Sequence, residues 1–529
     1  MTAANCTVDP TTRRTTPSTT ERTAERTMQR SAERTTEPAR VQPGVTRGTA
    51  PMRRVSAGLI VAALAVFAGC AAPPPAAHAP PALDLPTTTE ATAAVAPDWW
   101  NSFGDTQLTA LVEEALAGNR DLARAAARID QSRAALRLAR ADRLPRVDAG
   151  VASARQRVSE NTAVPLGGAS PIANDHRATI GVAYEVDLWS RLARSQDAAR
   201  DELLASAFAR DTLRNALAAQ VVQSYVALQA IDAQIALFER TVQAQRDSLA
   251  LQRRRFDAGD IGALDIRQLE AELIGNAAQL PRLARSRGEA ERALALVLGR
   301  SPRALVEGTV ARGTAPAAVP AAAQLPPVLP SDLLERRPDV QAAMARLRAA
   351  GARVDVARAA YFPSISLTAD FGRESAELSS LTHGTSLIWS VVASLTQPIW
   401  DGGRIDAQNE LARARRREVE IDYRDTVSTA FREARDALAA RSETEQSLRS
   451  AVEREAALAQ AASLIRRRFE GGEESRIEVI RAERDDLAAQ SEIVDARRAA
   501  AAAQADVFRA LGGGWPGAAE AVASVGASD

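Results

Sequence analysis

The sequence predicts a mostly helical protein with a small β part, built from one unit that occurs twice. Residues 191–299 match residues 213 positions further on, as in RRRF at 253–256 and at 466–469, and a second offset of 218 pairs Asp121 with Asp339. The chain is rich in Ala, Arg, Leu and Glu with only 4% aromatic residues, which favours long helices over a thick globular core. A duplication of this length indicates a supersecondary unit used twice, so function is sought in what two such units enclose.

The composition argues against an enzyme and against a nucleic-acid-binding protein. The formal net charge is zero, so no overall field would attract nucleic acid. The chain has arginine but no lysine, which excludes a Walker lysine or a Schiff-base lysine. Its three histidines, His78, His176 and His383, lie outside the predicted long helices and leave little material for a metal cluster or an activated nucleophile. We expect no catalytic residues, no metal site and no nucleic-acid partner.

Residues 52–69 have the layout of a bacterial lipoprotein signal peptide. A positive start at Met52-Arg53-Arg54 is followed by an apolar run at 55–68, and small residues precede Cys70. The end of this segment resembles a lipobox, in which the cysteine is diacylated and becomes the new N-terminus. The apolar run is short for a membrane span, and an ordinary signal peptide or a membrane anchor is the alternative. Cys70 is the predicted lipidation site.

The segments on either side of the signal peptide lack the periodicity of helices or strands. Residues 1–51 are rich in Thr, Arg and Glu and precede a complete signal, so we interpret them as a disordered or mis-annotated extension, with Met52 as the natural start. Residues 70–97 are rich in Pro, Ala and Thr and are expected to form a flexible tether. No run of eighteen apolar residues follows Cys70, so any further membrane crossing must use strands.

Each copy contains two short segments in which apolar and polar residues alternate. The first repeat, 98–300, has them at about 146–155 and 178–187, and the second repeat, 331–515, has them at about 364–372 and 387–397. In the third segment one face carries Ile365, Leu367, Ala369 and Phe371, and the other carries Ser364, Ser366, Thr368 and Asp370. Such alternation over about ten residues is typical of a transmembrane β-barrel strand. Amphipathic hairpins packed on the helices would show the same pattern.

Four strands are too few to close a membrane barrel, which needs about eight. Open strand edges are not stable in lipid, so a membrane interpretation requires several chains to contribute to one barrel. Aromatic residues lie at or near the predicted strand ends, where an interfacial girdle is expected. These candidates are Tyr184, Trp189, Tyr361, Phe362, Trp389 and Trp400.

Long helices follow the strands in both copies. Residues 191–256 contain no proline, and apolar residues recur every three or four positions, which predicts a helix roughly 100 Å long. A partner helix is expected at about 264–298, and the second copy repeats both from 404 to 511. Glycines at 259 and 262, and at 471 and 472, mark the turn of each helical hairpin. A coiled-coil spacer has the same local pattern, and only the strand segments distinguish the two interpretations.

Two further segments complete the chain. Residues 301–330 are rich in Pro and Ala, separate the repeats, and are expected to lie outside the helical body as a linker or equatorial segment. Residues 516–529 form a C-terminal tail.

Four motifs stand in order along the chain: YEVDLW at 184–189, LPSDLLERRPDV at 329–340, LTQPIWDGGR at 395–404 and ALGGGW at 510–515. Together with the lipobox they closely resemble the outer-membrane efflux lipoproteins of the TolC-like superfamily, in the NodT branch. The resemblance extends from about Trp99 to Trp515. Several motifs in order are far more specific than any one of them.

The resemblance implies a homotrimer with a twelve-stranded transmembrane β-barrel, four strands from each chain, continued by a twelve-helix α-barrel tunnel into the periplasm. It implies a lipid-anchored outer-membrane location, in contact with outer-membrane lipid. The implied partners are a periplasmic adaptor, or membrane fusion protein, and an inner-membrane resistance-nodulation-division transporter. The chain would be the passive exit duct for drugs or other small molecules, with no cofactor except the covalent lipid on Cys70.

The resemblance also nominates gate residues at the periplasmic turns of the hairpins, where acidic and polar residues constrict the closed tunnel of this family. ALDI at 263–266 matches the family's motif and nominates Asp265. The matching turn of the second copy contains Glu478 and Arg481, and Arg481 stands where the family usually has Asp. Glu478 and Arg481 lie three apart on a helix, so pairing with each other is the simpler interpretation.

Two other functions stay open on the sequence alone. A lipid-tethered periplasmic coiled-coil scaffold or adaptor would use the same helices without a barrel. An exit duct for secreted polypeptides would keep the fold and change the cargo.

Overall fold

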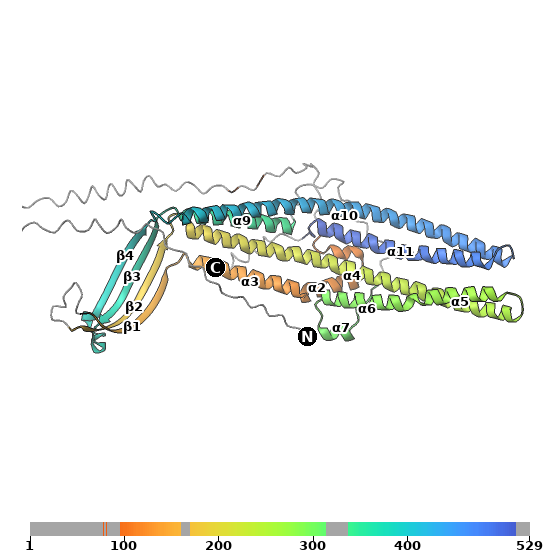
Figure 1. Cartoon of the computed structure of the whole chain (residues 1–529), viewed down its shortest axis with the longest axis horizontal. Helices are drawn as coiled ribbons and strands as arrows, with labels where there is room; N and C mark the ends of the chain where they lie inside the picture. Colours follow the sequence, from red (N-terminus) through yellow and green to blue (C-terminus); the bar gives the residue numbers. More distant parts are fainter. Residues whose placement is uncertain (1–77, 79–80, 82–95, 160–169, 314–336, 515–529) are drawn as a thin grey trace, which may run out of the picture. The chain divides into compact units, whose positions relative to one another are not determined.

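The computed structural model describes residues 78, 81, 96–159, 170–313 and 337–514 (Figure 1). The chain divides into two compact units, Met1–Ala72 and Pro73–Asp529, and every described residue belongs to the second unit. The predicted extension, the signal peptide, Cys70 and the C-terminal tail at 516–529 all lie outside the described residues.

The elements follow the two-copy plan that the offsets predict. The first repeat contains η1 (Trp99–Phe103), α2 (Thr106–Gly118), α3 (Arg120–Ala141), β1 (Arg146–Arg157), β2 (Ile172–Val186), α4 (Arg191–Asp257), α5 (Ala263–Ala277), α6 (Gln279–Val297) and α7 (Pro302–Glu307). The second contains α9 (Pro338–Ala359), β3 (Ser364–Ser375), η2 (Leu378–Ser380), η3 (Gly384–Ser386), β4 (Leu387–Thr396), α10 (Arg404–Glu470) and α11 (Arg476–Ala510). Each repeat thus places two strands between a shorter helix and a 67-residue helix.

The four strands form one antiparallel sheet in the order β1-β2-β3-β4 (Figure 1). The two repeats meet at β2 and β3, which pair from His176 opposite Ser375 to Val186 opposite Ile365. All four predicted strands are present, but β2 begins at Ile172 rather than near 178. The prediction missed this part because polar residues interrupt the apolar alternation there, whereas the backbone continues to pair with β1 as far as Arg157.

The long helices agree with the prediction in three of four cases. Helices α4 and α10 have 67 residues each, and α11 is continuous over 35 residues. The single helix expected at about 264–298 is instead divided into α5 and α6 at Ala278. Pro281 explains the division, since it has no N–H to donate to the carbonyl of Ala277. Val494 stands 213 positions further on, where α11 continues.

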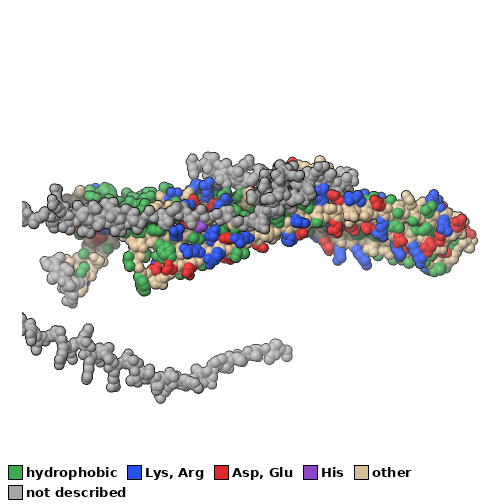
Figure 2. Space-filling model, turned by 90° about the horizontal axis from the view of Figure 1, so that it is seen from above, with side chains coloured by type: hydrophobic (Ala, Val, Ile, Leu, Met, Phe, Trp, Pro, Cys, Tyr) green, Lys and Arg blue, Asp and Glu red, His purple; other side chains and the backbone are tan. Residues whose placement is uncertain are grey.

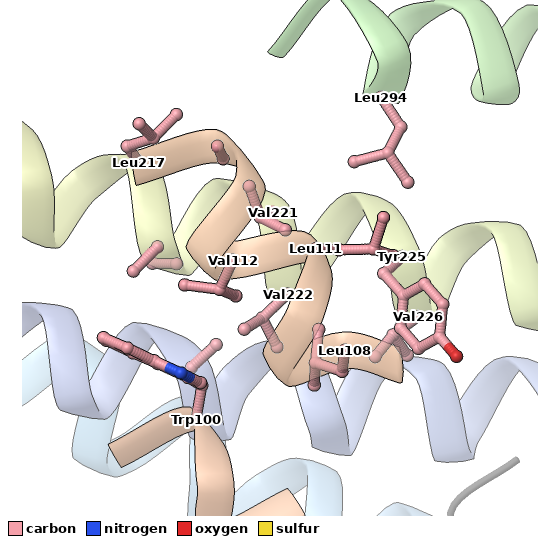
Figure 3. Packing of buried hydrophobic residues seen from close by; sticks show 14 of the residues in the cluster. Trp100, Leu108, Leu111, Val112, Leu217, Val221, Val222, Tyr225, Val226 and Leu294 are labelled. Atoms are coloured by element: carbon pink, nitrogen blue, oxygen red, sulfur yellow. The ribbon is translucent and has the colours of Figure 1, made fainter. Parts of the chain in front are cut away.

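The largest core cluster joins the two repeats. Side chains from η1, α2, α4 and α6 pack together, and Figure 3 shows the part around Leu111, Val221 and Tyr225. Ala501 and Ala505 of α11 belong to the same cluster, so the last helix of the second repeat packs on the first. A separate cluster links α9, α10 and α11. Helix α4 is apolar and long enough to cross a membrane by composition alone, yet many of its apolar residues lie in this core.

Part of the segment between the repeats packs on the helical body, contrary to the prediction for 301–330. Val310 is 2% exposed and belongs to the largest core cluster. Arg312 Nε donates to Asp232 at 2.9 Å, and the Gly313 N–H donates to the hydroxyl of Tyr225 at 2.8 Å. The composition of this segment was misleading, because two of its residues, Val310 and Arg312, make the contacts that hold it on the helical body. Residues 314–336 lie outside the described part of the chain.

Candidate functional site

The sheet has one apolar face, formed by all four strands together. The register places Val147 opposite Val182, Val182 opposite Ala369, and Ala369 opposite Val391, so the predicted apolar positions lie in common rows. Many of these side chains are exposed, among them Val151 at 87%, Trp389 at 72% and Val391 at 71%. In Figure 2 hydrophobic side chains gather near the end of the unit that carries the sheet. An exposed apolar surface of this size marks contact with a membrane or another protein.

The opposite face of the sheet is polar and carries more carboxylates than guanidiniums. One row crosses the sheet from Asp148 through Gly181 and Asp370 to Ser390. Gly181 leaves room for its neighbour, since a Cβ there would lie 3.1 Å from Asp370 Oδ1. Alternation along the paired strands places on this face Asp148, Asp175, Glu185, Asp370 and Glu374, against Arg146 and Arg177. Apolar and polar faces back to back are what a barrel wall between lipid and water requires.

Both outer strands of the sheet have an unpaired edge. The order β1-β2-β3-β4 leaves β1 and β4 each with one neighbouring strand among the described residues. All three pairings are antiparallel, so β1 and β4 run in opposite directions. The β4 edge of one copy is therefore complementary in direction to the β1 edge of another, and such edges demand a partner in lipid.

The predicted aromatic girdle separates into exposed and packed members. Trp389 and Trp400 are 72% and 89% exposed. Trp189 and Phe362 instead stack on each other with ring centroids 4.8 Å apart, and Trp189 Nε1 donates to the carbonyl of Pro363 at 2.7 Å. The two tyrosines of the predicted girdle differ as well. Tyr184 is half-buried on β2, and the hydroxyl of Tyr361 donates to Asp406 at 2.5 Å. The packed members hold the sheet to the helices.

Motif carboxylates fix the points where the chain leaves the sheet and enters the long helices. Asp187 accepts from the N–H groups of Leu192 and Ala193, at 3.1 and 2.8 Å, at the start of α4. Asp401 accepts from the N–H of Ile405 at 2.8 Å at the start of α10. Carboxylates at helix N-termini satisfy free donors and favour the helix dipole. These contacts explain two of the motif residues in physical terms.

The far ends of α4 and α10 turn in the same way, and we call these two turns, with the first turns of α5 and α11, the helical tips. At the first tip the Asp260 N–H donates to the Arg255 carbonyl at 2.9 Å, and Gly259 has φ 86°. At the second the Glu473 N–H donates to the Arg468 carbonyl at 2.9 Å, and Gly472 has φ 79°. Both are Schellman-type ends that need glycine in the left-handed conformation. The tips lie roughly 100 Å of helix from the sheet.

The predicted gate residues all lie at these tips. Asp265 is in the first turn of α5 and Glu478 in the first turn of α11, and the offset of 213 makes them equivalent. Arg481 Nη1 donates to Glu478 Oε1 at 2.5 Å, so these two residues form the expected pair on one helix. Asp265 has no such partner on α5, where Gln268 occupies the position equivalent to Arg481.

Arg476 connects the two helical hairpins of one chain. Its Nη2 donates to Ser248 Oγ of α4 at 3.1 Å, and its guanidinium lies 5.4 Å from the centroid of the Phe469 ring. Its Nε is buried without a hydrogen-bond partner. Burial lowers the pKa of Arg476, against the opposing effect of the Glu483 and Asp265 carboxylates. Arg476 is not among the residues that the sequence nominates for the gate, although its equivalent in the first copy is Ala263, and this difference between the copies was the available signal.

A cavity of 310 Å³ lies between the hairpins beside Arg476. Its lining comes from α4, α5, α10 and α11 and includes Arg240, Glu272, Arg466, Glu483 and Asp486. Ile480 of α11 packs against the apolar cluster of Leu249, Ile266 and Leu269. Among the described residues, the contacts between hairpins near the tips include a small apolar cluster, the hydrogen bond from Arg476 to Ser248 and a cavity lined by both polar and apolar side chains. Few apolar contacts make this a region of low local stability.

Within the described part of the chain no group of three or more His, Cys, Asp or Glu residues is arranged to hold a metal ion. The lipidation site, Cys70, lies outside that part.

Comparison with known proteins gives consistent results. The family model described as outer membrane efflux protein matches residues 111–300 and 329–513. Outer membrane protein OprJ of Pseudomonas aeruginosa is 37% identical over 424 residues, which are 79% of this chain and 86% of OprJ. The probable outer membrane lipoprotein SilC of Salmonella typhimurium is 31% identical over 465 residues, 86% of this chain and 98% of SilC. The CmeC outer membrane channel of Campylobacter jejuni has a similar fold, with a TM-score of 0.78 at 24% identity over 84% of this chain and 97% of CmeC.

Proposed function

Because the chain belongs to the outer membrane efflux protein family, we propose that three copies of it close one β-barrel and one helical tunnel, which together form the exit duct of a tripartite efflux system. The observation that carries the proposal is the two-faced sheet with two open, antiparallel edges. Four strands cannot close alone, whereas three chains supply twelve, within the range of closed membrane barrels.

The sheet argues against the coiled-coil scaffold. A scaffold would bury the apolar strand face on its own helices, but Val391 and Trp389 are more than 70% exposed in the single chain. Side chains on the polar face include Asp148 and Asp370, which suit a water-filled lumen. The sheet therefore has the arrangement of a barrel wall.

The partners and the lipid follow from the same proposal. We expect a periplasmic adaptor and an inner-membrane resistance-nodulation-division transporter to deliver small molecules to the tunnel. We expect the chain itself to be a passive duct without catalytic activity or cofactor, and Cys70 to carry a covalent lipid in the outer membrane. SilC, whose name states an outer membrane lipoprotein, supports the lipid.

Two neighbouring residues of β4 test the barrel. Val391 lies on the apolar face and Val392 on the polar face, and they are 71% and 49% exposed. Arginine on a lipid-facing position costs about 2–4 kcal/mol near the bilayer midplane, and a lumen position does not carry this cost. We expect Val391→Arg to abolish heat-resistant oligomers in outer-membrane fractions and Val392→Arg to preserve them. Equal assembly of both variants would contradict the barrel.

We propose that the helical tips form the periplasmic gate, with Asp265, Glu478 and Arg481 near the constriction. A symmetry axis brings three copies of each charge close together, so a change of charge alters the repulsion or pairing there. We expect Asp265→Arg and Arg481→Asp to raise single-channel conductance of the closed duct in planar bilayers. Currents equal to those of the unsubstituted protein in both variants would remove these residues from the gate.

A further inference from the structure

A histidine from the segment between the predicted lipid anchor and the first repeat lies against helix α9. His78 Nε2 is 3.1 Å from Asp355 Oδ1, and the two side chains are 22% and 12% exposed. His78 and Asp355 are 277 positions apart, so this is a long-range contact. A residue within the predicted flexible tether is therefore held on the surface of the second repeat.

Gly351 provides the space for the histidine ring. Gly351 and Asp355 are four residues apart on α9 and lie on the same face of the helix. A Cβ at position 351 would lie 3.0 Å from His78 Cδ2 and 3.1 Å from His78 Cγ. Glycine inside a helix costs roughly 0.5–1 kcal/mol relative to alanine, and α9 has alanine at most of its other small buried positions. The close approach of the ring accounts for a glycine that the helix itself does not favour.

This pair of residues exists in one repeat only. The positions of α3 that lie 218 before Gly351 and Asp355 are Arg133 and Arg137. Arg133 pairs with Asp130 on its own helix at 2.8 Å. Two guanidiniums would fill the space and offer no acceptor to an imidazole. The first repeat therefore cannot hold His78 in the same way, and the two helices are chemically distinct on this face.

Chain length limits where the lipid can lie. His78 is eight residues after Cys70, which at most span about 28 Å when fully extended. Asp355 is four residues before the end of α9, about 6 Å of helix, and β3 begins at Ser364. A cysteine fixed through His78 is thus kept within reach of the sheet end of α9 and far from the helical tips.

We propose that Gly351 and Asp355 form a docking site for His78, which holds the lipid-anchored end of the chain on the second repeat. With His78 docked, Cys70 can lie no more than eight residues of chain from the contact on α9. The position of the lipid relative to a barrel rests on the proposed function, whereas the docking of His78 does not.

Distances between spin labels test the docking in the full chain with Cys6 replaced by serine. Labels at Ala77→Cys and at Arg346→Cys, an exposed position of α9, report the separation of the segment from the helix. Labelled chains are diluted with unlabelled ones, so that each assembly holds one labelled copy. We expect a narrow distance distribution that becomes broad in His78→Ala, in Asp355→Ala and in Gly351→Ala.

The variants separate docking from folding and from lipidation. Gly351→Ala favours the helix, so a broad distribution in this variant reflects loss of the space for the ring. Arg137→Ala on α3 is the matched control and should keep the narrow distribution. A distribution that is broad in the parent, or equally narrow after His78→Ala and Gly351→Ala, would overturn the proposal. Intact mass of the same samples reports the lipid, and its absence would refute the anchor while a narrow distribution still supports docking.

Discussion

The two repeats build the same junction with different side chains. Asn119 and Arg337 stand 218 positions apart, at the N-caps of α3 and α9. Asn119 Nδ2 donates to the carbonyl of Val297, and Arg337 Nη1 to that of Ala510, both at 2.8 Å. The two acceptors are themselves 213 positions apart. Each repeat therefore connects the start of the helix that precedes its strands, α3 or α9, to the end of the second helix of its hairpin, α6 or α11.

The chemistry beyond that shared contact differs. Asn119 Oδ1 also caps α3, accepting from the N–H of Asp121 at 2.8 Å. Arg337 caps nothing and instead binds Asp339 at 2.7 Å and Glu433 at 2.9 Å. Burial acts to lower the pKa of Arg337, but these two carboxylates raise it above its ordinary value. Both repeats thus have a hydrogen bond from the N-cap side chain to a backbone carbonyl at the end of the hairpin, whereas the other contacts of the two N-cap side chains differ.

Strand glycines give the largest contrast between the repeats. A Cβ at Gly372 of β3 would lie 2.2 Å from the Ala178 carbonyl oxygen, whereas at Gly150 of β1 the nearest atom is 4.0 Å away. We expect Gly372→Val to separate β2 from β3, the only pairing between the repeats' strands in this sheet, and to abolish outer-membrane assembly. Gly150→Val should assemble normally in the same fractionation. Loss of assembly in both variants would mean that any bulk on the polar face is disruptive.

The second-largest effect is expected on thermal stability, at the junction that Asn119 and Arg337 form. Arg337→Met removes the partner of Asp339 and the nearer of the two arginines beside Glu433, the other being Arg509 at 4.0 Å. Removing one side of a buried ion pair costs about 3 kcal/mol when the carboxylates are partly exposed. Asn119→Ala should cost only about 1 kcal/mol, the usual value of a lost helix cap. Thermal unfolding of the two purified variants in the same detergent checks the order. A larger loss for Asn119→Ala would reverse the assigned roles.

At the helical tips, Arg476 and Arg466 are expected to differ in their effect on the closed-state conductance. Arg476 connects α11 to Ser248 of α4, whereas Arg466 pairs with Glu483 inside the second hairpin at 2.8 Å. We expect Arg476→Ala to release the hairpins from each other and raise the closed-state conductance several-fold, and Arg466→Ala to leave it near the parent value. Similar conductance in both variants would show that the contact between hairpins does not hold the gate.

Tyr225 gives the smallest and most specific effect, because the second repeat has Leu438 at the equivalent position. Burial and the hydrogen bond to Asp105 raise the pKa of Tyr225 to about 12. A raised pKa in the folded state means that this contribution to stability is complete below about pH 10 and is lost between about pH 10 and 12. Tyr225→Phe should cost about 1 kcal/mol at neutral pH and remove that alkaline component from the unfolding profile. A variant with the parent's full alkaline loss would contradict this assignment.

Sequence periodicity predicted the features that depend on local pattern. The 3.6-residue period located α4, α10 and α11, and strict alternation located the apolar face of the sheet, because the side that each residue faces determines its polarity along the whole element. It failed where a single residue determines the local structure. Pro281 divided a helix, and Val310 docked a segment whose composition suggested a linker. The contact of Arg476 with Ser248 joins residues 228 positions apart, and no local pattern encodes such a pairing.

Native mass spectrometry of the detergent-extracted protein tests whether three chains assemble, since the unequal repeats need other copies to close the sheet and the tunnel. We expect a complex of three chains, each with the mass of a chain that begins at a lipidated Cys70. A single chain that stays monomeric under mild detergent conditions, with its sheet edges open, would contradict it.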